Sequence, residues 1–275
     1  MIEIKTVNKG AELVSIKFNG EEKMHDGETF WNKHAPVLFP IVGKLKDGKT
    51  IIENNVYEMG QHGFARDMEF EKNSENSYVL KSNDETLKKY PYKFEFYISY
   101  KITDDTVITK YKVINKDDKK IRFGLGGHPA FKCDYSSGKY SLEFKEKEDD
   151  LEIYQLEDGL VKLEPEDKSK YFKNNRIILN KESFENDALI LKDLKSREVI
   201  LRDDNNLEKL IFKFEKFPYL GVWSKPEAPF LCIEPWFNTA DRVDSNGQYK
   251  DKENLIELDI NEEFEAEYSV KFFEN

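Results

Sequence analysis

The sequence has few of the residues that bind metals or form cross-links. Its 275 residues include only two cysteines, Cys133 and Cys232, and four histidines. The cysteines form no C-x-x-C pair and have no histidine at zinc-site spacing, so neither a disulfide framework nor a structural zinc site is indicated. We expect both cysteines to be reduced thiols in the core, and we predict no metal site.

The chain also lacks the excess of positive charge that nucleic-acid binding requires. Lys plus Arg number 43 and Asp plus Glu number 54, so the net charge is −11. A phosphate backbone needs a basic protein surface, and we therefore expect no nucleic-acid partner. A neutral small molecule is indifferent to this charge, whereas an anionic one needs a local cluster of Lys and Arg.

Long apolar runs are absent as well. No window approaches the ~20 apolar residues of a membrane span. The N-terminus carries alternating charges instead of the apolar segment of a signal peptide. We therefore expect no membrane partner and a cytoplasmic location.

Helical periodicity is rare, and strand patterns dominate. Residues 93–102 and 107–113 alternate in polarity around a TDDT turn, which predicts a long antiparallel hairpin. Only residues 82–90 have a clear helical pattern, with Ser82 or Asp84 as the cap.

This balance of patterns decides the fold class. A parallel α/β sheet needs a crossover of a dozen or more residues between strands, and the chain has too little helix for that. No linker, repeat or low-complexity tract divides the sequence. We therefore predict that residues 1–275 form a single all-β domain, a large antiparallel β-sandwich with very little helix.

The stretch FPIVGKLKDGKTII matches the G-x-x-x-x-G-K-[ST] pattern of a nucleotide-phosphate loop from Gly43 to Thr50. A phosphate loop must lead into a helix whose N–H groups hold the phosphates, but β-branched residues and an Asn-Asn turn follow here. We therefore interpret the match as accidental. We expect residues 41–44 to end a buried strand and residues 47–48 to form a hairpin turn.

Two histidines are candidates for chemistry. His62 lies in QHGFARD and His128 in GLGGHPAFKC, and the neighbouring glycines allow backbone or ligand to approach closely. Pro129 favours extended backbone at His128, which suits a side chain projecting from a strand end. The alternative is a capped or core histidine. His25 and His34 have no adjacent glycine and stand among charged residues, and we expect them at the surface.

Glu234 is the matching carboxylate candidate. It ends a strongly apolar run and precedes a proline and Trp236. Burial against tryptophan would raise its pKa into a range useful for proton transfer, although an exposed strand-end glutamate is the alternative. Trp31, Trp223 and Trp236 offer flat apolar faces for sugar rings, or belong to the core. Together these residues suggest acid–base chemistry on a neutral polar molecule.

Six blocks of sequence resemble the aldose 1-epimerase (galactose mutarotase-like) family, especially its LacX-type branch. They run in order from about residue 10 to 245: FPIVGKL, YEMGQHGFARD, ETLKKYPYKFEFYISY, GLGGHPAF, ENDALILKDLKSREVIL and GVWSKPEAPFLCIEPW. The combination of GHPAF with CIEPW is specific. The resemblance implies a β-supersandwich, no cofactor, and interconversion of the α and β anomers of a hexose or related aldose.

The resemblance also implies a role for individual residues. His128 is expected to be the general acid that protonates the ring oxygen, and Glu234 the general base that deprotonates the anomeric hydroxyl. His62 is expected to bind substrate near the ring oxygen, and Asp187 to bind sugar hydroxyls. Lys44 stands where the family more often has an arginine that contacts hydroxyls.

Arg66 and Trp223 lie inside matching blocks and are further candidates for substrate binding. Asn238 is a departure, because related sequences often have glycine there, and this affects the expected shape of the pocket wall.

Two alternatives to a mutarotase for free sugars stay open. A noncatalytic carbohydrate-binding or sugar-sensing protein needs the aromatic and hydroxyl-bonding groups but not the acid–base pair. A hexose-6-phosphate mutarotase needs cations, and Lys44, Arg66, Lys225 and Arg242 lie near the blocks. The expected partner in every case is a small-molecule sugar, and the oligomeric state is not predicted.

Overall fold

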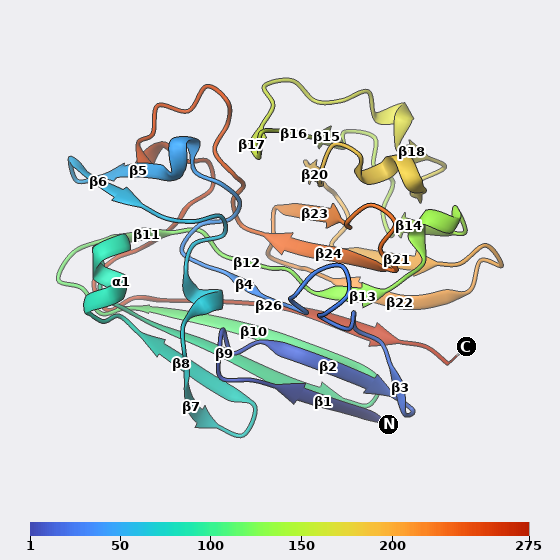
Figure 1. Cartoon of the computed structure of the whole chain (residues 1–275), viewed down its shortest axis with the longest axis horizontal. Coiled ribbons are helices and arrows are strands. Elements are labelled where there is room, and N and C mark those ends of the chain that lie inside the picture. Colours follow the sequence, from blue (N-terminus) through green and yellow to red (C-terminus); the bar gives the residue numbers. More distant parts are fainter. Residues whose placement is uncertain (275) are drawn as a thin grey trace.

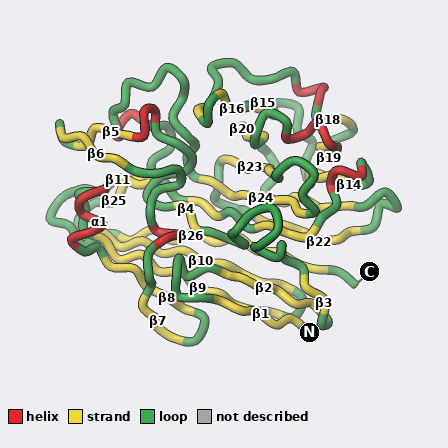
Figure 2. Tube along the Cα trace, in the orientation of Figure 1, coloured by secondary structure: helices red, strands yellow, loops and turns green. Residues whose placement is uncertain are grey.

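The computed structural model describes residues 1–274, and β-strands dominate it (Figures 1 and 2). Strands make up 46% of the structure and helices 9%, and the strands of every sheet pair antiparallel. The predicted all-β class with very little helix is therefore confirmed. Two large sheets form the molecule, and several small strand pairs surround them.

The larger sheet has ten strands and contains the predicted hairpin. Strands β9 and β10 pair along their whole length, with Phe96 opposite Val113, because alternate side chains on both strands are apolar and buried. The strands in sheet order are β18 (Phe172–Lys173), β19 (Arg176–Leu179), β14 (Tyr140–Phe144), β21 (Glu198–Arg202), β22 (Glu208–Lys213), β26 (Glu263–Phe272), β10 (Thr106–Asn115), β9 (Phe94–Thr103), β8 (Ser77–Lys81) and β7 (Glu71–Ser74).

The second sheet carries the chemistry described below. Its strands in order are β15 (Glu152–Tyr154), β20 (Leu189–Lys192), β23 (Tyr219–Trp223), β24 (Phe230–Trp236), β12 (Gly126–Gly127) and β4 (Val37–Leu38), and β13 (Ala130–Lys132) also pairs with β24. In the view of Figure 1, β10 and β26 lie on one side of β24, and the short strands between residues 152 and 161 lie on the other.

Short elements complete the fold. The remaining strands are β1 (Ile2–Thr6), β2 (Leu13–Phe18), β3 (Glu21–Glu22), β5 (Lys49–Ile52), β6 (Asn55–Glu58), β11 (Ile121–Phe123), β16 (Leu156–Glu157), β17 (Leu160–Val161) and β25 (Ile256–Leu258). The 3-10 turns are η1 (Lys46–Gly48), η2 (Ala65–Asp67), η3 (Tyr135–Ser137), η4 (Lys168–Lys170), η5 (Lys181–Phe184) and η6 (Tyr249–Asp251).

The predicted helix is present as α1 (Asp84–Lys89), but its cap is not one of the predicted residues. Asn83 is the N-cap, and its side chain accepts hydrogen bonds from the backbone N–H groups of Glu85 and Thr86. Among residues 1–274, no helix is both long enough and apolar enough to span a membrane.

The phosphate-loop pattern does not form a phosphate loop. The predicted strand over residues 41–44 is absent, since the chain there is irregular, and residues 47–48 belong to the 3-10 turn η1 instead of a hairpin turn. The hairpin begins directly after η1, where β5 pairs with β6 around the Glu53–Asn54 turn. Strand therefore follows the pattern where a phosphate-binding helix would have to begin.

Strand β24 is buried on both faces, which explains its unbroken apolar run. Leu231 and Ile233 belong to the main core, together with side chains of the ten-stranded sheet. Cys232 and Trp236 point to the opposite face and belong to two smaller clusters there. Because successive side chains of a strand alternate between faces, Glu234 lies on this second face.

Candidate functional site

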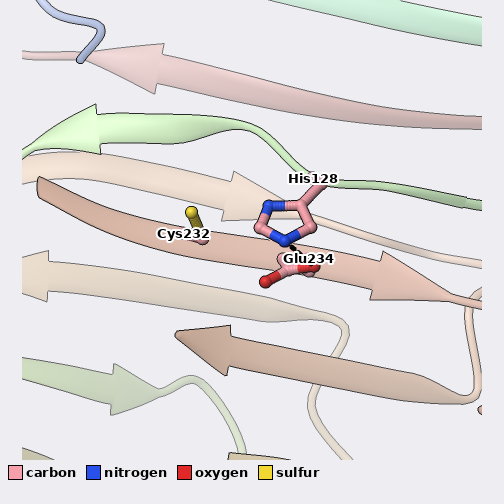
Figure 3. Close-up of side chains that lie close together, drawn as sticks. All are labelled: His128, Cys232 and Glu234. Carbon is pink, nitrogen blue, oxygen red and sulfur yellow. Dashed lines mark ion pairs between the residues drawn. The ribbon is translucent and has the colours of Figure 1, made fainter. Parts of the chain in front are cut away.

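Strand register places His128 opposite Glu234. Gly126 on β12 pairs with Trp236, and Ala130 on β13 pairs with Cys232. The segment between Gly126 and Ala130 therefore runs beside β24 and places His128 next to Glu234. The side chains meet there, with Nε2 of His128 3.2 Å from Oε2 of Glu234 (Figure 3). Both are buried, His128 to 7% and Glu234 to 1% exposure.

Burial shifts the two groups in opposite directions. It lowers the pKa of His128 from 6.5 to about 3, and the nearby Arg66 charge acts in the same direction. Burial also raises the pKa of Glu234 well above 4.5, and the negative charge of Asp187 acts in the same direction. Each shift favours the neutral form of its group, which is the neutral imidazole for His128 and the protonated carboxyl for Glu234.

The pair lies in the wall of a cavity of about 420 Å³. Cavities of about 300–1,000 Å³ are typical of small-molecule sites. Six of the seven predicted site residues line it: His62, Arg66, His128, Asp187, Trp223 and Glu234. A separate cavity of about 500 Å³ is lined by His25 and Cys133, among others, but by neither His128 nor Glu234. Size alone would therefore have selected the wrong cavity.

His62 is held in a defined orientation by Gly43. The backbone N–H of Gly43 donates to Nδ1 of His62 at 3.0 Å, and the His62 N–H donates to the Gly43 carbonyl oxygen at 2.7 Å. Since Nδ1 accepts, the neutral ring carries its proton on Nε2, which is free to serve the cavity. Burial, followed by the charges of His128 and Arg66, lowers the pKa of His62 well below 6.5.

Gly43 is itself required by the backbone. Its φ is +69°, and a Cβ there would lie 2.7 Å from the backbone of Ala240. The first glycine of the phosphate-loop pattern therefore has a use, but the use is to let the chain pass Ala240 and hold His62.

Arg66 and Asp187 supply charge to the cavity lining. Arg66 donates through Nη2 to the carbonyl oxygen of Gln61 at 2.9 Å, and burial lowers the pKa of its guanidinium. Asp187 is exposed and has a φ of +71°, and its carboxylate accepts a hydrogen bond from the N–H of Ala188 at 2.7 Å. A polar ligand in the cavity can therefore meet both a cation and an anion.

Aromatic rings enclose the acid–base pair. The Trp31 ring lies 4.7 Å from the His128 ring and 5.6 Å from the Trp223 ring, measured between centroids. Trp236 also lines the cavity. All three tryptophans named from the sequence therefore belong to the site, and their apolar faces suit the C–H groups of a sugar ring.

The expectation that His25 lies at the surface is wrong. It is 3% exposed, and its Nε2 lies 2.8 Å from the carbonyl oxygen of Trp31. The ring also packs on Phe230 at 4.3 Å. His25 thus supports the segment that carries Trp31, a role that its polar sequence neighbours did not reveal. His34, also expected at the surface, is half-buried.

Lys44 is the predicted site residue that does not line the cavity. Its exposed side chain donates through Nζ to the carbonyl oxygen of Asp158 at 2.8 Å. Asp158 joins β16 to β17, and the neighbouring Leu156 and Gly159 do line the cavity. The contact therefore fixes a loop at the cavity edge, and we leave Lys44 out of the proposed sugar-binding set.

Several polar atoms at the cavity have no hydrogen-bond partner within the described part of the chain. They are Nε of Arg66, Nδ1 of His128, Nε1 of Trp236 and, apart from the 3.2 Å contact with His128, both carboxylate oxygens of Glu234. Buried polar groups are normally paired, so donors and acceptors gathered at one cavity indicate a ligand that offers both. A sugar hydroxyl is such a group.

Sequence reasoning missed the position of Cys232. Both cysteines are buried and unpaired with each other, as predicted. Cys232, however, lies beside the acid–base pair, and its sulfur is within 4.8 Å of ligand atoms of His128 and Glu234 (Figure 3). The available signal was the C-x-E spacing on a strand, which places both side chains on one face.

A family model and known relatives match nearly the whole chain. The family model described as Aldose 1-epimerase matches residues 2–256. The chromosomally encoded protein LacX of Lactococcus lactis subsp. lactis is 33% identical to this chain, in an alignment that covers 94% of this chain and 91% of LacX.

Solved structures show the same fold. A galactose mutarotase related enzyme from Lactobacillus acidophilus is 33% identical, with a TM-score of 0.87 over 100% of this chain and 95% of that one. A galactose mutarotase-like protein from Lactobacillus casei is 28% identical, with a TM-score of 0.89 over 99% and 97% of the two chains.

Proposed function

Because the chain belongs to the aldose 1-epimerase family, we propose that it interconverts the α and β anomers of a hexose or related aldose in the cavity beside His128. The observation that carries this proposal is the buried contact of 3.2 Å between His128 and Glu234 at the cavity wall. Ring opening needs an acid and a base at the anomeric centre, and this pair supplies both.

The proton count of the pair suits the reaction. In the reactive form, one proton has moved from the Glu234 carboxyl to the His128 imidazole, so Glu234 is a carboxylate and His128 an imidazolium. Burial disfavours this distribution of charge, and the transfer of the proton therefore adds to the barrier. Glu234 takes the proton from the O1 hydroxyl while His128 gives its proton to the ring oxygen O5, the C1–O5 bond breaks, and C1 becomes an aldehyde carbon. After rotation about C1–C2, the O5 hydroxyl returns its proton to His128, Glu234 protonates O1, and the ring closes as the other anomer.

The cavity supplies the remaining interactions. His62 offers Nε2–H near the pair, and Arg66 and Trp236 offer unpartnered N–H groups to sugar oxygens. Asp187 accepts hydrogen bonds from hydroxyls. Burial strengthens the interactions of His62 and Trp236 because little water competes for these buried groups.

The proposal is tested by polarimetry or NMR of freshly dissolved α-D-glucose and α-D-galactose. We expect the protein to accelerate the approach to anomeric equilibrium for at least one sugar. Glu234→Gln and His128→Asn should each lower the rate by about 10²- to 10⁴-fold. Glu3→Gln, a change of the same type at an exposed strand residue, is the matched control and should keep the full rate.

Two results would redirect the proposal. Full rate in correctly folded Glu234→Gln would show that Glu234 is not the base. Sugar binding without any acceleration would favour a noncatalytic sugar-binding protein.

A phosphorylated aldose is the second candidate substrate. Arg66 and Lys225 both line the cavity, and a phosphate group can accept from guanidinium and ammonium donors. Including the 6-phosphates of glucose and galactose in the same assay separates the candidates. A preference for the phosphate that is lost in Arg66→Gln would select it.

A further inference from the structure

Cys232 is a buried thiol that the proposed reaction does not use. It precedes Glu234 by two residues on β24, so both side chains leave the same face of the strand. Its partner across the strands is Ala130, two residues after His128. The ligand atoms of His128, Cys232 and Glu234 consequently all lie within 4.8 Å of one another (Figure 3).

These atoms are available for a ligand. Cys232 is not in a disulfide, Nδ1 of His128 has no hydrogen-bond partner among residues 1–274, and the Glu234 oxygens have none apart from the 3.2 Å contact with Nε2 of His128. Imidazole nitrogen, thiolate sulfur and carboxylate oxygen are the three ligand types of zinc, whereas magnesium and calcium take oxygen ligands. Zinc bonds of about 2.0–2.3 Å place ligand atoms roughly 3.3–3.8 Å apart, so side-chain movements of about 1 Å complete the site.

We propose that His128, Cys232 and Glu234 form a Zn²⁺ site whose occupancy switches off the acid–base pair. Three protein ligands leave one coordination position open for water or a sugar hydroxyl. Binding releases two protons, one from the Cys232 thiol and one from the His128 and Glu234 pair. The two negative ligands that result balance the charge of the metal, so the buried site stays neutral.

The site competes directly with catalysis. A bound metal occupies the lone pairs of the imidazole and the carboxylate that must carry protons during ring opening. This inhibition rests on the proposed mutarotase function, but the binding of the metal does not.

Cobalt tests the binding without reference to sugars. Metal-free protein is titrated with Co²⁺, and the thiolate-to-cobalt charge-transfer absorption is recorded before and after Zn²⁺ is added. We expect one Co²⁺ per chain with this absorption in the wild type and its loss in Cys232→Ser. Cys133→Ser, which removes the other buried thiol, is the matched control and should keep the absorption.

The binding proposal is overturned if the wild type shows no thiolate absorption, or if the absorption persists in Cys232→Ser. Thermal unfolding of each variant shows whether a lost signal reflects a lost fold. A folded Cys232→Ser protein without the absorption supports the site.

Inhibition by Zn²⁺ tests whether the bound metal blocks the acid–base pair. Each protein is compared with its own metal-free mutarotation rate, and we expect Cys232→Ser to need at least tenfold more Zn²⁺ for half-inhibition than the wild type or Cys133→Ser. A chelator should restore the rate, and Mg²⁺ should not lower it. Equal Zn²⁺ sensitivity in Cys232→Ser and the wild type would overturn the switch.

The two proposals fail in different ways. If no aldose responds, yet the cobalt absorption appears and depends on Cys232, the metal site stands and the mutarotase function does not. If mutarotation is present but cobalt finds no thiolate, the metal site falls alone.

Discussion

The acid–base pair and the residues around it are held by two differently built parts of the molecule. His128 and Glu234 lie on paired segments of the seven-stranded sheet, and β24 is buried on both faces. His62, Arg66 and Asp187 lie in irregular segments or a short 3-10 turn, fixed by a few individual hydrogen bonds. The proposed chemistry therefore depends on strand register, and the proposed sugar recognition depends on loops.

This difference predicts separable effects of mutation. Changes in the pair should lower the rate constant, because they remove proton transfer while the pocket keeps its shape. Changes in the loops should mainly raise KM, because they move groups that bind the sugar in its ground state.

The largest effect is expected from the pair, tested as a unit. Since each group is useful only with the other, the double variant His128→Asn with Glu234→Gln should be no slower than the worse single variant, about 10²- to 10⁴-fold below wild type. Saturation kinetics of the three variants measure this. Additive losses in the double variant would show that the groups act independently.

The next largest effect is expected at the loop position that holds His62. Gly43→Ala should destabilise the protein by about 2–5 kcal/mol, because the new methyl group meets the Ala240 backbone at positive φ. Gly48→Ala is the matched control. Its φ is also +69°, but nothing lies within 4 Å, so only about 1 kcal/mol of backbone strain is expected.

Urea unfolding measures the stability of both glycine variants. The KM for the sugar shows whether Gly43→Ala also displaces His62. Equal losses of stability in the two variants would mean that the close approach to Ala240 is unimportant.

A smaller, pH-dependent effect is expected when Glu234 becomes glutamine. Between pH 4.5 and 6.5 the folded pair holds one proton, and the unfolded chain also holds one, on the histidine. Above pH 6.5 the unfolded chain loses that proton while folded Glu234 keeps its own. The pair's contribution to wild-type stability should therefore fall with rising pH, by at most ~1.4 kcal/mol per unit.

Glu234→Gln lacks this titration, so its stability relative to wild type should increase as the pH rises above 6.5. Urea unfolding of both proteins between pH 6 and 8.5 tests this. If the free energies of unfolding of the two proteins change in parallel with pH, the raised pKa of Glu234 is contradicted.

The smallest effect is expected at Lys44. Lys44→Ala removes an exposed contact with Asp158 and no cavity-lining group, so KM should change less than about twofold and the rate constant not at all. Steady-state kinetics decide the point. A tenfold rise in KM would return Lys44 to the sugar-binding set.

Local sequence patterns predicted the sheets well, because alternation of apolar residues follows directly from burial of one strand face. The hairpin of β9 and β10 is the clearest case. The irregular segment over residues 41–44 was mistaken for a strand, since its apolar residues are buried by contacts distant in sequence. That residues 1–275 form one domain and lie in the cytoplasm stays a prediction.

The site was harder to predict from the residues alone. The matched motifs named His128 and Glu234, but only strand register shows that they touch. The burial of His25 depends on which segments pack together, and its sequence neighbours carry no such information. For Cys232, the C-x-E spacing places its side chain on the face of Glu234, but only the pairing of the strands brings it near His128. Lys44 shows that a motif match alone does not locate a side chain, because its ammonium group contacts the carbonyl oxygen of Asp158 and does not line the cavity. Its role in sugar binding stays a prediction.

The double burial of β24 also has a consequence for motion. Backbone amides in a strand packed on both faces exchange with solvent only when large parts of the molecule unfold, whereas amides in exposed loops exchange by local opening. We therefore expect the amide of Glu234 to exchange among the slowest and the amide of Asp187, in an exposed segment, to exchange faster. Under the proposed function, a sugar would leave through fluctuations of the exposed loop while His128 and Glu234 stay in contact.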